Sequence, residues 1–129
     1  MILIIGGAYQ GKKEYAYSLL EDTAQAKISC ADGELDSYEA VLQRPVINHF
    51  HVYIRRLLEE GKDPNDFAKK MISQNPSSII IMDEIGSGIV PMTPKEREYR
   101  QTFGMIGQYL ASKAEVVYRV ICGIGSQIK

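Results

Sequence analysis

The residues with the clearest chemical purpose lie near the amino terminus, in the stretch Gly6 to Lys12. Their spacing satisfies G-x-x-x-x-G-K, the pattern of a phosphate-binding loop, between the apolar run Met1–Ile5 and a helical pattern. In such loops backbone N–H groups converge on phosphate oxygens, and the lysine neutralises the β and γ phosphates. We therefore predict that a nucleotide, ATP or GTP, is bound by Gly6, Gly7, Ala8, Tyr9, Gln10, Gly11, Lys12 and Lys13. The alternative interpretation is a glycine-rich turn with an exposed lysine.

Lys13 departs from the pattern, because a serine or threonine normally stands there and gives Mg²⁺ a hydroxyl ligand. A charged ammonium group cannot ligate a metal. Three interpretations stay open: water takes the ligand position, Lys13 itself compensates phosphate charge, or the site binds nucleotide without efficient transfer. A lysine that simply points to solvent is compatible with the last two.

A second candidate group follows the apolar stretch "SSIIIM", where Asp83 and Glu84 come at the end of a predicted strand. An aspartate at that place holds the hydration shell of Mg²⁺, and a following glutamate can orient or deprotonate a nucleophile. Ligands of open α/β sheets gather at the carboxyl ends of strands, so this pair and the glycine loop can share one crevice. We predict catalytic roles for Lys12, Asp83 and Glu84 and a metal role for Asp83; the alternative is an acidic pair that caps the next turn.

The elements that must position these residues alternate between strand and helix. Hydrophobic spacing predicts five strands, at Met1–Ile5, at Lys27–Ala31, after Pro45, at Ser77–Glu84 and at Glu115–Gly123. It also predicts four helices: Lys12–Asp22, a helix from about Val52 to Gly61, one that begins after a cap at Asn65 or Asp66, and one from about Pro94 to Ala114. The polar stretch "DGELDSYEAVLQRP" can hold a helical turn or remain a loop. The predicted fold is α/β, of the P-loop NTPase (RecA-like) type, with a mostly parallel sheet and helices on both faces.

The bulk composition narrows the class of protein. A chain of 129 residues with 45% hydrophobic and 24% charged residues and a net charge of −1 predicts one nucleotide-binding domain over residues 1–129 and no broad nucleic-acid surface. Cys30 and Cys122 have no metal-site spacing, so we expect buried thiols in a reducing compartment. The Met1–Ile5 run is too short to span a membrane. A cytoplasmic protein is expected.

Two blocks of the chain resemble the bifunctional adenosylcobinamide kinase / adenosylcobinamide-phosphate guanylyltransferase family of cobalamin biosynthesis. The first is "IIGGAYQGKKEYA". The second and more specific block is similar to the family's N-E-V-G-x-G-I-V-P motif and the helix and strand after it: "DEIGSGIVP", then Arg97, Arg100, Gly104, Gly107 and Gln108, then Ala114, Glu115, Val116 and Gly123. The resemblance covers about the first twenty and the last fifty residues, with a weaker middle.

In the middle, the family motif V-D-C-L-T-x-W-x-x-N-L-L aligns with "INHFHVYIRRLL". This alignment puts Asn48 at the family's aspartate, His51 at its threonine and Tyr53 at its tryptophan. Asn48 brings no negative charge to a metal, whereas Asp83 stands where the family usually has asparagine. We hypothesise that Asp83 restores the missing carboxylate.

The resemblance implies ATP or GTP with Mg²⁺ as cofactors, phosphoryl transfer to the aminopropanol hydroxyl of a cobinamide-type corrinoid, and a homo-oligomer. Guanylyl transfer is not expected, because the family's GMP-accepting histidine falls in a segment that this chain lacks, and neither His49 nor His51 stands at its position. Two alternatives remain: a nucleotide-binding protein without catalysis, and an unrelated small-molecule kinase on the same fold.

Overall fold

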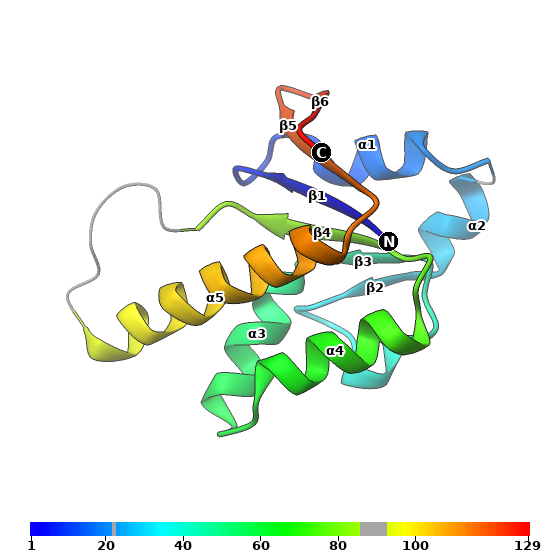
Figure 1. Cartoon of the computed structure of the whole chain (residues 1–129). Helices are drawn as coiled ribbons and strands as arrows, with labels where there is room; N and C mark the ends of the chain where they lie inside the picture. The colour runs from blue at the N-terminus through cyan, green and yellow to red at the C-terminus, as the bar shows by residue number, and fades with distance from the viewer. Residues whose placement is uncertain (22, 86–92) are drawn as a thin grey trace.

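The computed structural model describes residues 1–21, 23–85 and 93–129, and in these ranges six strands form one sheet in the order β2-β3-β4-β1-β5-β6 (Figure 1). The strands are β1 (Ile2–Gly6), β2 (Cys30–Asp32), β3 (Val46–Asn48), β4 (Ile79–Asp83), β5 (Val116–Ile121) and β6 (Ile124–Gln127). Strands β1 to β5 run parallel, and β6 pairs with β5 in the antiparallel sense. The predicted mostly parallel α/β sheet is confirmed.

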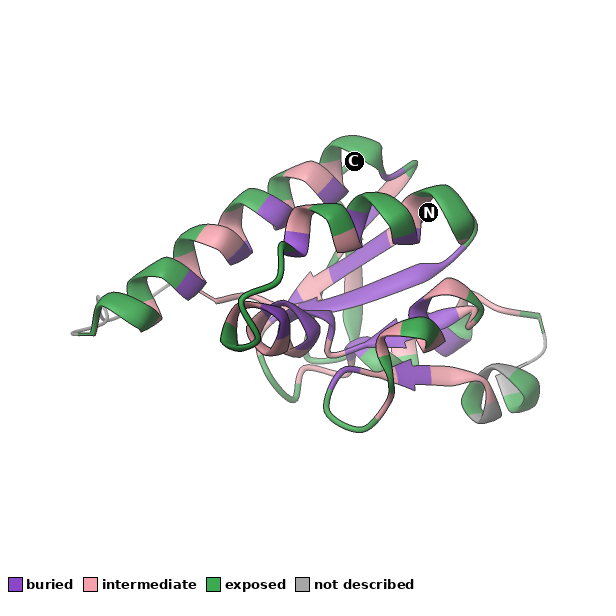
Figure 2. Cartoon of the chain, turned by 90° about the horizontal axis from the view of Figure 1, so that it is seen from below, coloured by how far each residue is buried: buried purple, intermediate pink, exposed green. Residues whose placement is uncertain are grey.

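Helices cover both faces of this sheet, as predicted. The helices are α1 (Lys12–Ser18), α2 (Thr23–Ile28), α3 (Phe50–Glu59), α4 (Pro64–Gln74) and α5 (Pro94–Lys113), with a 3₁₀ helix at Tyr38–Leu42. Helix α1 packs Ala16 and Tyr17 against Ile4 and Ile81, whereas α3, α4 and α5 lie over the opposite face (Figure 1). Strands β3 and β4 are almost wholly buried and β6 is mostly exposed, and the helices expose their outer sides (Figure 2).

Strand register brings the carboxyl ends of the central strands to one edge. Gly6 of β1 lies opposite Asp83 of β4, and Asp32 of β2 lies opposite Asn48 of β3. Because the strands are parallel, the residues that follow them emerge on the same side of the sheet. The two predicted groups, the glycine loop and Asp83, are therefore neighbours.

Several predicted boundaries are wrong at the ends of elements. The last strand ends at Ile121 rather than at Gly123, because Cys122 and Gly123, both with positive φ, turn the chain back into β6. That pair forms the two-residue turn that suits a twisted hairpin. Cys122 is consequently exposed and Cys30 only partly buried, which corrects the expectation of two buried thiols.

The helical predictions also need three corrections. Helix α1 ends at Ser18, and the unpredicted α2 occupies the start of the strand expected at Lys27–Ala31. The cap of α4 is Asp63, whose carboxylate accepts a hydrogen bond from the Asn65 N–H, and not Asn65 or Asp66. The helical-turn interpretation of the polar stretch before β3 is confirmed. The predicted motif residues 86–91 lie outside the described part of the chain.

Among the described helices, none is both long enough and apolar enough to pass through a lipid bilayer.

Candidate functional site

The glycine loop joins β1 to α1 in a conformation that depends on glycine at two places. A Cβ on Gly6 would lie 2.5 Å from the carbonyl oxygen of Val120 in β5. Gly11 has a φ of 87° and lies against Gly123, 3.1 Å from the position of an added Cβ. The loop is thus pressed against β5 and the turn after it, and larger residues would displace it.

Gln10 fastens the tip of the loop to the β5–β6 turn. Its side-chain oxygen accepts a hydrogen bond from the Cys122 N–H at 2.8 Å, and its backbone carbonyl accepts one from the Gly123 N–H at 2.7 Å. The neighbouring Tyr9 has a φ of 59° and a fully exposed side chain. The hairpin that the sequence did not predict therefore supports the glycine loop.

Lys12 turns back across the loop toward the end of β4. Its ammonium group donates to the Gly7 carbonyl at 2.5 Å and forms an ion pair with Asp83 Oδ1 at 2.8 Å. Only 7% of Lys12 is exposed. Two residues of the predicted site thus form an ion pair, and the carboxylate of Asp83 balances the positive charge of Lys12.

His51, in the first turn of α3, extends this pair. Its Nδ1 accepts a hydrogen bond from the Asp83 N–H at 3.2 Å, and its Nε2 lies 3.5 Å from Asp83 Oδ2. Burial lowers the pKa of His51 to about 4, so the ring is neutral near pH 7. Since Nδ1 accepts, the single proton of the neutral ring sits on Nε2 and faces the carboxylate.

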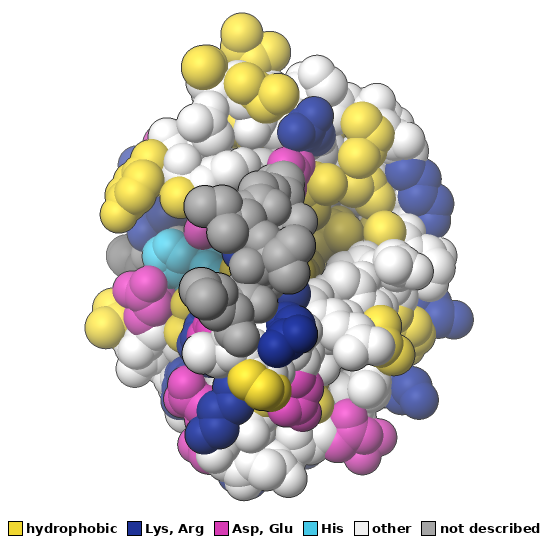
Figure 3. Space-filling view, turned by 90° about the vertical axis from the view of Figure 1, so that its left-hand side faces the viewer, with side chains coloured by type: hydrophobic (Ala, Val, Ile, Leu, Met, Phe, Trp, Pro, Cys, Tyr) yellow, Lys and Arg dark blue, Asp and Glu magenta, His cyan; other side chains and the backbone are white. Residues whose placement is uncertain are grey.

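These residues line a cavity of about 410 Å³ at the carboxyl ends of the strands. Its lining comes from the loop and α1, from the ends of β2, β3 and β4, and from α3: Ala8, Tyr9, Gln10, Gly11, Lys12, Lys13, Glu14, Asp32, Glu34, Asn48, His49, His51 and Asp83. Figure 3 looks onto this end of the sheet and shows histidine atoms at the surface beside acidic side chains. Of the predicted loop residues, Gly6 and Gly7 do not line this cavity.

Lys13 lies at the cavity wall with an exposed side chain, and its ammonium group is 6.0 Å from the centre of the Tyr17 ring. This placement agrees with the interpretation that Lys13 stands free to compensate phosphate charge. It offers no oxygen ligand.

Glu84 lies apart from the other predicted catalytic residues. Its two carboxylate oxygens accept hydrogen bonds from Arg119 of β5 at 2.7 and 3.1 Å. Glu84 lines a different, apolar hollow next to α5 and does not contribute to the cavity of Lys12 and Asp83. A bidentate arginine pair of this kind holds the carboxylate in place.

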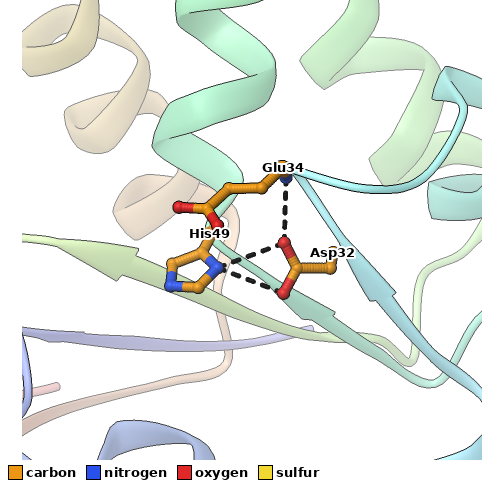
Figure 4. A group of neighbouring side chains, drawn as sticks. All are labelled: Asp32, Glu34 and His49. Carbon is orange, nitrogen blue, oxygen red and sulfur yellow. Dashed lines mark hydrogen bonds and ion pairs between the residues drawn. The ribbon is translucent and has the colours of Figure 1, made fainter.

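Sequence reasoning missed the opposite wall of the cavity, where Asp32, Glu34 and His49 gather (Figure 4). Oxygen and nitrogen atoms of these three side chains lie within 4.8 Å of one another. Asp32 Oδ1 accepts the Glu34 N–H at 2.8 Å, and both Asp32 oxygens lie near His49 Nδ1, at 3.1 and 3.2 Å. These hydrogen bonds thus explain why the three residues lie close together. The signal in the sequence was the pair of acidic residues after the second predicted strand.

A magnesium ion beside the glycine loop would depend on Asp83. Mg²⁺ is commonly held by one or two carboxylates together with substrate phosphates and water, so a single aspartate beside this loop fits the ion. Asp83 is 23% exposed on the side chain and reaches the cavity. Neither Asn48 nor Lys13 adds a negative charge.

Comparisons with known proteins agree with the residues that suggested the resemblance. A family model described as cobinamide kinase / cobinamide phosphate guanyltransferase matches residues 46–128, more than half of the chain. The bifunctional adenosylcobalamin biosynthesis protein CobU of Escherichia coli (strain K12) is 26% identical over an alignment of 180 positions that covers 100% of this chain and 99% of that protein. CobU of Salmonella typhimurium is 39% identical over 51 residues, 40% of this chain and 28% of that protein. The 180 positions exceed the 129 residues of this chain, so the relative from Escherichia coli carries additional residues.

Proposed function

The chain belongs to the cobinamide kinase / cobinamide phosphate guanyltransferase family, and on this basis we propose that it binds ATP or GTP at the glycine loop and transfers the γ-phosphoryl group to a hydroxyl of a cobinamide-type corrinoid. The observation that carries the proposal is the ion pair of Lys12 with Asp83 at the wall of a cavity large enough for a nucleotide triphosphate tail. A role in cobalamin biosynthesis follows from the family.

In this proposal each residue has a separate task. The N–H groups of the loop surround the β and γ phosphates, and Lys12 moves from Asp83 to the phosphate oxygens. Asp83, released from Lys12, would hold Mg²⁺, and the ion would supply neutralisation of phosphate charge. Lys13 adds a positive charge from the cavity wall. Such transfer depends on positioning and on electrostatic stabilisation more than on covalent chemistry by the protein.

A nucleotide-binding protein without catalysis is the second candidate function. Two observations favour it: Lys13 stands where a hydroxyl ligand for the metal is expected, and the ion pair with Asp83 already balances the positive charge of Lys12. Guanylyl transfer is not part of the proposal, because His49 and His51, the two histidines of the chain, both lie at the start of α3 and not in an additional segment before β3.

The test is to incubate the protein with nucleotide labelled either at the γ or at the α phosphate, with and without cobinamide and Mg²⁺. We expect γ label in the corrinoid product and no α label on the protein. In the Lys12→Ala variant the product should disappear, whereas Lys70→Ala, which removes an exposed lysine of α4, should leave it unchanged. Tight binding of nucleotide without product would favour the second candidate.

A further inference from the structure

We infer that His49 is the proton acceptor for the attacking hydroxyl group, and that Asp32 holds its ring in the form that accepts a proton. The inference deepens the proposed phosphoryl transfer and rests on it. It assigns a general base to the wall of the cavity that faces the phosphate loop, on two residues to which the sequence motifs gave no role.

The contact between Asp32 and His49 decides where the imidazole carries its hydrogen. An ionised carboxylate only accepts hydrogen bonds, and both Asp32 oxygens lie near Nδ1, at 3.1 and 3.2 Å (Figure 4). The hydrogen of the neutral ring therefore sits on Nδ1. The Asn48 amide nitrogen also approaches Nδ1, but at the longer distance of 3.4 Å. The lone pair is left on Nε2, at the ring edge turned away from Asp32 in Figure 4.

The carboxylate of Asp32 is held in place by the turn that follows β2. The Glu34 N–H donates to its Oδ1 at 2.8 Å, and the Asp36 side chain accepts the Asp32 N–H at 2.7 Å. Arg56 of α3 donates to the carbonyls of Gly33 and Asp36 at 2.7 and 2.8 Å. A base works best when the group that orients it is itself held in place, and here hydrogen bonds hold Asp32.

The backbone of His49 adds an independent observation. His49 caps α3 with a φ of 51° and a ψ of 44°, the left-handed region that costs energy for a residue with a Cβ. The Gly33 backbone lies so close that an added Cβ would fall 2.1 Å from the His49 carbonyl oxygen. Strained backbone of this kind collects at functional sites, because the surrounding structure must enforce it.

The position of His49 relative to Lys12 suits a transfer between two bound molecules. Strand β4 separates β3 from β1, and neighbouring strands are about 4.8 Å apart, so the ends of β3 and β1 lie about 10 Å from each other. The rings of His49 and His51 are 5.7 Å apart, and His51 leads through Asp83 to Lys12. Lys12 and His49 line the same cavity of about 410 Å³, which has room for a phosphoryl group and an incoming hydroxyl.

His51 does not serve as the base in its place. Its Nδ1 already accepts the Asp83 N–H, and its Nε2 hydrogen faces the Asp83 carboxylate. His49, with 34% of its side chain exposed, is the more accessible of the two rings.

The step balances without any further reactant. The hydroxyl oxygen forms a bond to the γ phosphorus, while the bond from that phosphorus to the β,γ-bridging oxygen breaks and leaves its electron pair on the nucleoside diphosphate. The hydroxyl proton moves to His49 Nε2. Asp32 stabilises the imidazolium that forms, and the proton then passes to water. Proton acceptors of this kind contribute about 100-fold to 10,000-fold in rate.

Charged and titratable groups face His49 from every element around it. Asp32 faces it from the end of β2, Glu34 from the turn after β2, and His51 from its own helix. Across the cavity stand the remaining charged groups of the lining, which are Lys12, Lys13, Glu14 and Asp83. For this reason the test compares variants at one pH and observes the ring directly.

The first measurement is long-range ¹H–¹⁵N NMR of the imidazole rings in the complete, nucleotide-free protein. We expect neutral His49 with its hydrogen on Nδ1, and a shift toward the other tautomer in Asp32→Asn. Neutral His49 with its hydrogen on Nε2 overturns the inference. This result does not depend on turnover, so it is distinguishable from a failure of the proposed function, which shows as the absence of labelled corrinoid from the native protein.

The second measurement uses His49→Gly, because glycine adopts a φ of 51° without strain. We expect a loss of about 100-fold in kcat with unchanged nucleotide affinity, and partial recovery when free imidazole is added. Unchanged kcat overturns the inference. Glu34→Gln is the matched control, because a cation held by the three side chains needs that carboxylate and proton transfer does not. A loss in Glu34→Gln equal to that in Asp32→Asn, relieved by more divalent cation, overturns the inference in favour of a metal site.

Discussion

The two walls of the cavity are built in different ways. The loop wall, residues 8–12 with Asp83, uses contiguous backbone and one ion pair between the first residue of α1 and the last residue of β4. The histidine wall, Asp32 with His49, uses side chains that are brought together by the pairing of β2 with β3 and by the turn after β2. A sequence motif can identify the first kind of site, because most of its residues are close together in the sequence. The second kind depends on strand register and becomes visible only in the folded chain.

The largest effect should follow from breaking the histidine wall at Gly33. In Gly33→Ala the new Cβ would fall 2.1 Å from the His49 carbonyl oxygen, so the turn after β2 must move. We expect a loss of about 3 kcal/mol or more in the free energy of unfolding, measured in urea. Nucleotide affinity should change little, because the loop wall is built separately.

The matched control for that variant is Gly104→Ala in α5. Nothing lies within 4 Å of a Cβ added at Gly104, and alanine favours a helix over glycine. This substitution should stabilise the protein by about 0.5 to 1 kcal/mol. Equal effects of the two variants on stability, or a loss of nucleotide binding in Gly33→Ala, would show that the walls are not independent.

The pH dependence of stability tests whether His51, which lies between the two walls, is neutral in the folded protein. Its pKa is about 4 in the folded protein, because of burial, and near 6.5 in the unfolded chain. The unfolded state therefore binds more protons between these values. Stability is complete above about pH 6.5 and falls as the pH drops toward 4, by an amount on the order of 3 kcal/mol.

The comparison for this prediction is His51→Asn, whose amide oxygen can replace Nδ1 as the acceptor of the Asp83 N–H. The variant lacks the titrating ring, so we expect its stability to fall less over the same pH range. Urea unfolding of both proteins without nucleotide or added cation gives the difference. Parallel curves for the two proteins would contradict the assignment of a neutral, buried His51.

We expect the smallest effect on stability from a change at Gln10, whose side chain supports the loop wall. Gln10→Ala removes the hydrogen bond from the Cys122 N–H to the Gln10 side chain, and one such bond contributes about 1 kcal/mol. We expect the free energy of unfolding to fall by about that amount. Nucleotide affinity should fall about fivefold, because the loosened tip of the loop must become ordered when the nucleotide binds. Gln101→Ala, at an exposed position of α5, is the control. Identical nucleotide affinity of both variants would mean that the hairpin does not support the loop.

Much of the fold was predictable from local pattern. The apolar run of β1 and the stripe of Tyr99, Phe103 and Ile106 on α5 are long enough for their period to be clear. Strand β6 was missed, because "IGSQ" has neither alternation nor β-branched residues beyond Ile124, and it pairs only because the preceding turn adopts positive φ. The Asp63 cap was signalled by the proline that follows it at the first helical position.

The candidate site was predictable in part, for the same physical reason. Lys12 and Asp83 were expected to share a crevice, and parallel pairing of β1 with β4 brings them together. The role predicted for Glu84 stays a prediction, since its pairing with Arg119 depends on β5 lying on the other side of β1. Asp32 was not predicted, because its contact with His49 joins the end of β2 to the residue that follows β3, and this depends on the pairing of the two strands.

The most direct test of the central claim is calorimetric titration of the protein with ATP and GTP analogues that resist hydrolysis. The account predicts binding of one nucleotide per chain and, in Lys12→Ala, a loss of about 30-fold or more, the value of a charged hydrogen bond of 2 kcal/mol. Lys70→Ala should bind as the native protein does. Equal affinity of the native protein and Lys12→Ala, or no binding by the native protein, would contradict the claim that the glycine loop is a nucleotide site.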